Sequence, residues 1–121
     1  MARVELISYE IDKVNEAGAV ALNTALFTAL DASDGAAYDA SGRDDKTLLL
    51  VQNSATSEGT LTVKAGNGIQ GVNDLSVVVP ASSTVGLVLE SGRFKKISGD
   101  DKGKIILAGA ATLKVAVVKL P

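Results

Sequence analysis

The sequence predicts an all-β fold: a single-domain antiparallel β-sandwich or jelly-roll-like barrel with an N-terminal arm or short helix. From Thr47 onward, apolar and polar residues alternate with the period of two that is typical of β-strands. Clusters of Gly, Asn, Asp and Ser, which favour turns, separate these runs at short intervals. The length of 121 residues fits one domain. We therefore expect an N-terminal arm or first strand over residues 1–24, followed by a β-sandwich domain over residues 25–121.

The chain from Thr47 onward contains a series of short strand patterns. Leu48–Val51 is a continuous apolar run, which indicates a strand that is buried on both faces or nearly so. The later runs alternate, so one set of side chains, including Leu61 and Val63, is expected to face the core. The predicted strands cover residues 47–52, 60–64, 75–79, 84–90, 104–107 and 112–120, with a further short segment around Phe94 and Ile97 and inward positions at Leu113, Val115 and Val117.

The first 46 residues show a different pattern. Residues 4–9 and 25–30 each predict a strand. Residues 11–22 are rich in Ala and predict a short helix or an extended arm, in which Gly18 disfavours the helix by roughly 1 kcal/mol relative to Ala. Asp31–Lys46 is polar, acidic and contains Gly, so we expect a loop there. Loops of this length in a small domain are usually functional or mobile.

The composition excludes several kinds of functional site. The chain has no cysteine and no histidine, so it can form no disulfide, no zinc site of Cys and His, and no His-based or Cys-based catalytic centre. Its aromatic residues are two Tyr and two Phe, without Trp, which is too few for a platform that stacks sugars or bases. The net charge of −2 and the scattered Lys and Arg residues predict no nucleic-acid partner.

Neither a membrane role nor catalysis is expected. The first residues lack the basic and then apolar pattern of a signal peptide, and no apolar run approaches the roughly 20 residues that cross a bilayer. No G-x-S-x-G or S-x-x-K motif places a nucleophile. Pairs of carboxylates suited to glycoside hydrolysis usually line aromatic clefts, which this composition does not supply. We therefore expect a protein without enzymatic activity and without a cofactor.

One glycine motif resembles a nucleotide-binding fingerprint. Gly66–Gly71 has the spacing G-x-G-x-x-G and follows a predicted strand. Phosphate binding at such a motif needs a helix whose N-terminus faces the pyrophosphate. The next residues, Val72–Pro80, predict a turn and a strand instead of a helix. A tight connection between strands is the favoured interpretation.

The predicted acidic loop is a candidate for calcium binding. Its aspartates are Asp31, Asp34, Asp39, Asp44 and Asp45. Their spacing does not match the EF-hand, which places oxygen ligands at alternate positions and ends with a Glu. A solvated loop is the favoured interpretation and a calcium site the alternative. Asp100 and Asp101, between Gly99 and Gly103, predict an ordinary turn.

The remaining candidate is a protein interface. A continuous aliphatic sheet face and a possible N-terminal arm suit self-association, because obligate interfaces resemble a domain core cut in half. The alternative is that these aliphatic residues fill the core of the monomer. The pattern assigns no individual interface residue.

Four segments of the second part of the chain resemble a known group of proteins. They are Asp45–Asn53, Leu61–Leu75, Leu89–Lys95 and Lys114–Pro121. In the order of their strands and turns, these segments are similar to the small capsid decoration or cement proteins of tailed bacteriophages. The resemblance covers Lys46–Pro121, about three-fifths of the chain, and includes no catalytic residue.

The resemblance implies a β-sandwich or jelly-roll-like module on the outer surface of a virion, often a trimer at three-fold positions. Its partner would be the major capsid protein, whose shell it would stabilise. Two alternatives remain open: a structural protein of the phage tail, neck or baseplate, and a bacterial adhesin or ligand-binding β module. In the last case Asp31–Lys46 would be the contact site.

Overall fold

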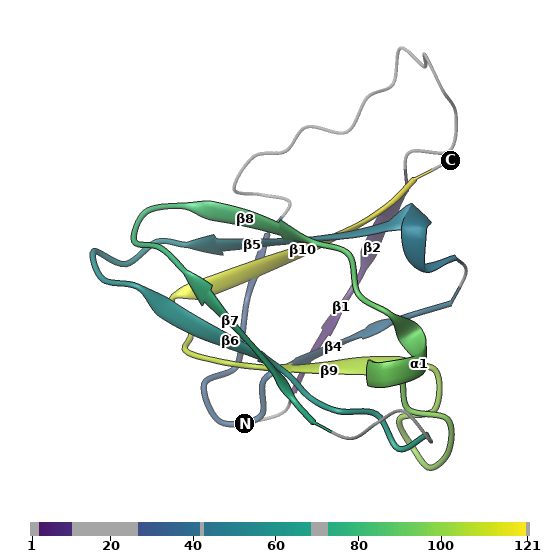
Figure 1. The fold of residues 1–121 in the computed structure, drawn as a ribbon. Helices are drawn as coiled ribbons and strands as arrows, with labels where there is room; N and C mark the ends of the chain where they lie inside the picture. The colour runs from purple at the N-terminus through teal and green to yellow at the C-terminus, as the bar shows by residue number, and fades with distance from the viewer. Residues whose placement is uncertain (1–2, 11–26, 42, 69–72, 121) are drawn as a thin grey trace.

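The computed structural model describes residues 3–10, 27–41, 43–68 and 73–120, which form two facing β-sheets (Figure 1). The strands of sheet A, in spatial order, are β1 (Val4–Leu6), β4 (Ala36–Asp39), β9 (Lys104–Ala108), β6 (Gly59–Val63) and β7 (Leu75–Val79). Those of sheet B are β2 (Ser8–Glu10), β10 (Leu113–Lys119), β5 (Thr47–Asn53) and β8 (Thr84–Leu87), and β3 (Thr28–Ala29) also pairs with β10. Helical turns occur at η2 (Asp44–Lys46) and α1 (Ser91–Phe94). The predicted all-β sandwich is confirmed.

The N-terminal segment contributes an edge strand to both sheets. Strand β1 pairs in parallel with β4, and β2 pairs in parallel with β10, whereas the other strand pairs are antiparallel. Ile7 lies between β1 and β2 and is 78% exposed. Val4 and Leu6 pack against the core, so this part of the predicted arm belongs to the sandwich. The predicted helix over residues 11–22 lies outside the described residues.

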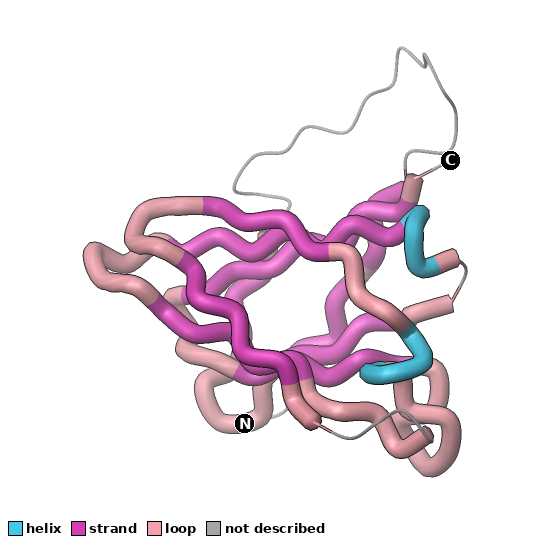
Figure 2. The backbone as a smooth tube through the Cα atoms, viewed as in Figure 1, coloured by secondary structure: helices cyan, strands magenta, loops and turns pink. Residues whose placement is uncertain are grey.

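The core lies between the sheets, in the region that the strands surround in Figure 2. Alternate side chains of each strand point into it because successive residues of a strand face opposite sides. Leu61 and Val63 of β6 are fully buried, as predicted from their alternation. The predicted inward positions of β10 are also buried, namely Leu113, Val115 and Val117. Because the connections cross repeatedly from one sheet to the other, both sheets depend on this one core.

The prediction of a loop over Asp31–Lys46 was wrong for much of its length. Asp31 and Gly35 form a tight turn through two mutual backbone hydrogen bonds, of 2.7 and 3.3 Å. Gly35 has a φ of 72°, and a Cβ at this position would collide with the carbonyl oxygen of Leu107. The turn leads into β4, whose Ala36, Ala37 and Tyr38 are buried. The sequence pattern did not predict this strand, because its alanines are small and lie between acidic residues.

Two further predictions needed correction near residue 90. The segment around Phe94 was expected to be a strand, but Ser91–Phe94 forms the helical turn α1, which buries Phe94. The strand expected over residues 84–90 ends at Leu87. At the start of α1, the backbone N–H of Ser91 and its hydroxyl donate to Asp44 Oδ2, at 3.0 and 3.1 Å. This contact lies between residues 47 positions apart, and the local pattern carries no sign of it.

A buried asparagine connects the two sheets at one end of the sandwich. Asn53, at the end of β5, is 1% exposed. Its Nδ2 donates to the carbonyls of Ser57 at 2.9 Å and of Val79 at 3.1 Å, and its Oδ1 accepts from the backbone N–H of Ala55 at 3.0 Å. The side chain thus holds the end of β7 in sheet A and the turn after β5 in place.

An ion-pair network attaches the N-terminus to the turn before β9. Arg3 Nη2 lies 2.8 Å from Glu5 Oε1 and 2.8 Å from Asp101 Oδ1, and Lys104 Nζ lies 3.1 Å from Glu5 Oε1. The hydrogen bond from Arg3 lowers the pKa of Glu5 and also that of Asp101. The turn that contains Asp101 was predicted, and Gly99 and Gly103 adopt positive φ in it.

Substituting Asn53→Ala is expected to destabilise the fold. It leaves the part-buried N–H of Ala55 and the carbonyls of Ser57 and Val79 without their side-chain partner, which should lower the free energy of unfolding by about 1–3 kcal/mol. Urea denaturation measures the change. Asn67→Ala is the control, because Asn67 is exposed and its bonds to Ser98 and Ile97 lie at the surface. Equal losses in the two variants would contradict the role given to Asn53.

The Arg3 network is expected to make stability depend on acid pH. The folded-state pKa values of Glu5 and Asp101 lie below their unfolded values, so the network's stabilisation is complete above about pH 5 and disappears as the pH falls below about 4. Arg3→Met should therefore lower the melting temperature near neutral pH and have little effect at about pH 2.5. The matched control is Arg43→Met, whose pair with Asp45 is mostly exposed. An Arg3→Met effect that is constant with pH would contradict the prediction.

Candidate protein-interaction surface

Strand β5 is apolar on both of its faces, as the run Leu48–Val51 predicted. Leu49 and Val51 point into the core and are at most 1% exposed. Leu48 and Leu50 point the opposite way, to the outer face of sheet B, and remain partly exposed. An outer face normally carries polar residues in a two-layer sandwich. The two outward leucines are therefore the first sign of an interaction surface.

The strand register shows which residues lie beside these leucines. Leu50 is paired with Ala116 of β10 on one side and with Gly86 of β8 on the other. Leu48 is paired with Val118 of β10. Leu87, the last residue of β8, is paired with Leu49, and Val88 follows it along the chain.

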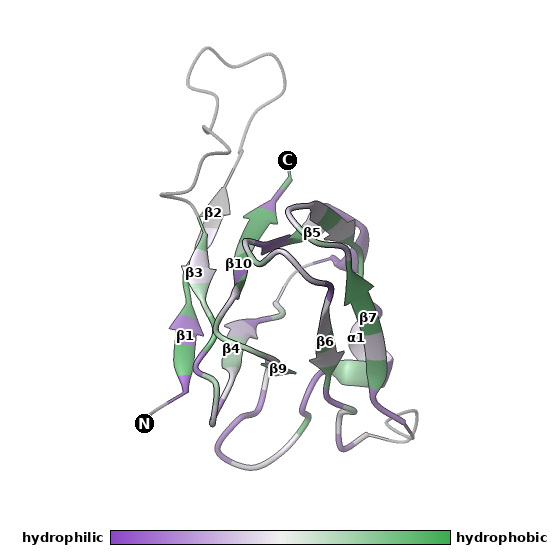
Figure 3. Ribbon diagram, turned by 90° about the vertical axis from the view of Figure 1, so that its left-hand side faces the viewer, coloured by the Kyte–Doolittle hydropathy of each residue, from purple (hydrophilic) through white to green (hydrophobic). Residues whose placement is uncertain are grey.

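The two sides of this outer face differ in how well they are covered. Ala116 and Val118 of β10 are each 2% exposed, and Phe27 packs against them. In Figure 3, β10 is coloured hydrophobic over most of its length, in agreement with burial on both faces. Val88, on the β8 side, is 61% exposed. We call the open part, formed by Leu48, Leu50, Gly86 and Val88, the aliphatic face.

The aliphatic face has a notch beside a projecting side chain. A Cβ at Gly86 would meet only the Cδ1 of Leu48 and the Cδ2 of Leu50, each at 3.6 Å, which is ordinary van der Waals contact. The notch at Gly86 therefore adjoins the two leucines, and Val88 projects two residues farther along the chain. None of the four residues is charged. The face is suited to contact with another apolar protein surface.

A polar groove borders the aliphatic face. It has a volume of about 280 Å³ and is lined by Gln52, Asn53, Ser54, Ser82, Thr84 and Lys114. Lys114 forms no ion pair within the described part of the chain. Sites for small organic ligands are mostly apolar and enclose their ligand, whereas this groove is open and polar. It resembles the wet rim that surrounds the apolar centre of many interfaces.

The sandwich also has open sheet edges. Strands β7 and β8 each pair with only one of the described strands. Strand β7 contains no charged residue and no proline, and its Val78 is 54% exposed. Natural proteins usually protect such edges with charges, prolines or covering segments. Among the described strands β7 and β8 are therefore open edges, as β1 and β2 are at the other ends of the two sheets.

The five aspartates of the predicted acidic loop do not come together. Asp44 binds Ser91, and Asp45 forms an ion pair with Arg43 at 2.8 Å. Asp31 and Asp39 each accept a backbone N–H two residues farther along the chain. Among the described residues, no group of three acidic side chains is placed to hold a metal ion. The structure therefore gives the calcium alternative no support.

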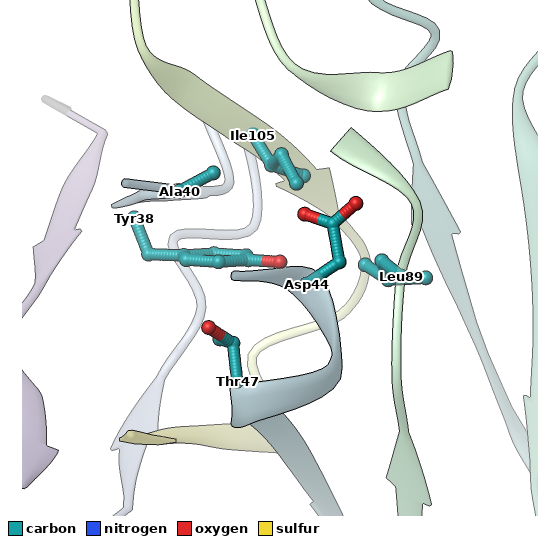
Figure 4. Close-up of a pocket in the computed structure, with 6 residues that line it drawn as sticks. All are labelled: Tyr38, Ala40, Asp44, Thr47, Leu89 and Ile105. Carbon is teal, nitrogen blue, oxygen red and sulfur yellow. The ribbon is translucent and has the colours of Figure 1, made fainter. Parts of the chain in front are cut away.

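Tyr38 and Asp44 line a small cavity between the sheets (Figure 4). The hydroxyl of Tyr38 points toward Asp44, and the hydroxyl of Thr47 lies nearby. Burial, and secondarily the charge of Asp44, raises the pKa of the Tyr38 hydroxyl. The cavity volume is about 10 Å³, which is space for about one water molecule. This feature belongs to the packing of the core and cannot hold an organic ligand.

The described part of the glycine motif has a structural role. The backbone N–H of Gly66 donates to the carbonyl of Arg93 at 2.9 Å, and a Cβ at Gly66 would lie 2.5 Å from the carbonyl oxygen of Lys95. Gly66 thus allows the chain to approach the end of α1 closely. Residues 69–72 of the motif region lie outside the described residues. The strand predicted after the motif is confirmed as β7.

Sequence reasoning identified the aliphatic run of β5 but missed the rest of the surface. Gly86 and Val88 were placed on the strand predicted over residues 84–90. Strand alternation puts Gly86 on the opposite face, but only the pairing of β8 with β5 places it beside Leu48 and Leu50. The signal that could have identified them is the absence of charge from both β5 and β8.

Within the described residues, no helix has the length and hydropathy needed to cross a membrane. Comparisons of the chain with models of protein families, with curated proteins and with solved structures found no match.

Proposed function

We propose that this chain is a structural protein of a tailed-phage virion that binds the outer surface of the capsid and stabilises the shell. The observation that supports a binding role is the aliphatic face, which remains open on a sandwich whose other aliphatic strand residues largely fill its core. The phage assignment rests on the resemblance over Lys46–Pro121, which corresponds to the strands from β5 to β10. The proposed partner is the major capsid protein.

The proposed mechanism is binding linked to assembly and needs no catalytic group or cofactor. A protein that binds only the assembled lattice stabilises it by about 2.7 kcal/mol per site when its free concentration is 100 times Kd. A copy that touches two neighbouring subunits gains further affinity, because its second contact forms at a high effective concentration. A small stiff sandwich suits this task, since little conformational entropy is lost when it binds.

Self-association is part of the proposal. The resemblance implies three copies at a three-fold position, and an aliphatic face is the kind of surface that copies of one chain bury together. We propose neither a nucleic-acid nor a membrane partner, because the Lys and Arg residues are scattered and the net charge is −2. A structural role in the phage tail, neck or baseplate would use the same surface, and electron microscopy of virions labelled against this chain distinguishes the two locations.

Capsid binding is tested by mixing the purified chain with undecorated capsids. We expect the chain to co-sediment at micromolar concentration, with a fixed number of copies per capsid and a raised melting temperature of the shell. Unassembled capsid protein is the control and should bind far less, because the site is proposed to span neighbouring subunits. Absence of binding to capsids at micromolar concentration would refute the proposal.

A further inference from the structure

We propose that Asn67 is a site of spontaneous deamidation, in which the backbone nitrogen of Gly68 attacks the side-chain amide of Asn67 and water completes the reaction. Three features point to this modification: glycine follows Asn67 directly, Asn67 is exposed, and the space around Gly68 is open. The modification concerns the free chain and does not depend on capsid binding.

The attacking nitrogen of Gly68 is unhindered. Asn67 and Gly68 lie in a bend of the chain that follows β6. Gly68 has no Cβ, and the nearest neighbours of an added Cβ would be side-chain atoms of Ile97, at 3.5–3.9 Å. Within the part of the chain that the structure describes, the backbone N–H of Gly68 donates to no acceptor. No side chain of its own and no hydrogen bond to a described residue therefore restrains this nitrogen.

The reaction exchanges ammonia for water and needs no other reactant. The nitrogen of Gly68 gives up its proton and forms a bond to Cγ of Asn67, while the bond from Cγ to Nδ2 breaks and Nδ2 leaves as ammonia with that proton. The product is a cyclic succinimide. Water then opens the ring, at Cγ to give aspartate or at the backbone carbonyl carbon to give isoaspartate, in which the main chain runs through Cβ and Cγ. Either product adds one negative charge to the chain.

The hydrogen bonds of the Asn67 amide favour the attack and make its outcome visible in the fold. The backbone N–H of Ile97 donates to Oδ1 at 2.7 Å, and a donor at this oxygen stabilises the negative charge that develops there when Cγ is attacked. Nδ2 donates to the carbonyl and the hydroxyl of Ser98, each at 3.2 Å. A carboxylate has no N–H to donate, so deamidation removes both bonds to Ser98. The chain after β6 then loses part of its attachment to the segment after α1.

The other described asparagines lack the features that the reaction needs. Asn53 is buried, and its amide forms three hydrogen bonds. The N–H of Ser54, which would be the nucleophile there, donates to the carbonyl of Thr112 at 3.2 Å. Asn73 is exposed, but it is followed by Asp74, whose side chain hinders the approach of the backbone nitrogen. Deamidation should therefore be concentrated at Asn67.

Peptide mapping by mass spectrometry tests the proposal on the folded full chain, incubated at about pH 8.5, where loss of the backbone proton is favoured. We expect aspartate and isoaspartate to accumulate in place of Asn67, with release of an equal amount of ammonia, while Asn53 and Asn73 stay intact. Gly68→Ala is the matched variant and should slow the reaction roughly tenfold, because its methyl group hinders the attacking nitrogen. This variant should fold, since the new Cβ meets Ile97 at ordinary contact distance. Circular dichroism verifies the fold.

Three results would overturn the proposal. They are an intact Asn67 after Asn53 or Asn73 has deamidated, equal rates in the native chain and in folded Gly68→Ala, and deamidation of Asn67 in urea but not in the folded chain. If Gly68→Ala fails to fold, the order in which the three asparagines react in the native chain still decides. A chain that deamidates at Asn67 but does not bind capsids would keep this inference and refute the capsid proposal.

Discussion

The pairing of β10 with β5 is the interaction on which the rest of the structure depends. The two strands are paired over the full length of β10, from Leu113 to Lys119. On its other edge, β10 pairs with β2 and β3, so these two strands join sheet B through β10. Its inward valines meet the core residues of sheet A. Without the pairing of β10 with β5, sheet B would divide into two parts, and β2 would lose its connection to β5 and β8.

The two apolar faces of β5 connect the stability of the fold with its proposed use. The inward face supplies Leu49 and Val51 to the core, and the outward face supplies Leu48 and Leu50 to the aliphatic face. On the β10 side, the outer face is already covered by Phe27. On the β8 side, Gly86 and Val88 leave it open. The same strand therefore holds the sandwich together and presents its apolar surface, which limits how far evolution could change one role without affecting the other.

Polar contacts determine how the connections between strands are arranged. At the end of β5, where the chain leaves sheet B for sheet A, the side chain of Asn53 forms hydrogen bonds with backbone groups of Val79 and Ala55. Asp44, in the helical turn η2, accepts two hydrogen bonds from Ser91 and so holds α1 beside η2. The Arg3 network does the same for the N-terminus. Buried or partly buried polar groups need partners, so each of these contacts selects one path for its connection.

Much of this fold could be predicted from the local pattern of the sequence. Alternation identified the strands from β5 onward, and the inward positions Leu61, Val63 and Leu113 were correct because burial on one face of a strand has a period of two. The pattern failed for β4, where Ala36 and Ala37 are too small to mark a core strand and acidic residues flank them. It also failed at α1, whose first residue is bonded to Asp44, 47 positions away in the chain.

The amino-acid sequence is sufficient to predict an all-β sandwich and a β5 that is apolar on both faces, and it shows that no Cys or His is present. Those properties depend on composition and on neighbours a few residues away. The folded chain alone reveals that Gly86 lies beside Leu48 and Leu50, and that Asp31, Asp39, Asp44 and Asp45 make separate contacts. These arrangements depend on strand register and on contacts between distant segments, which local periodicity does not encode.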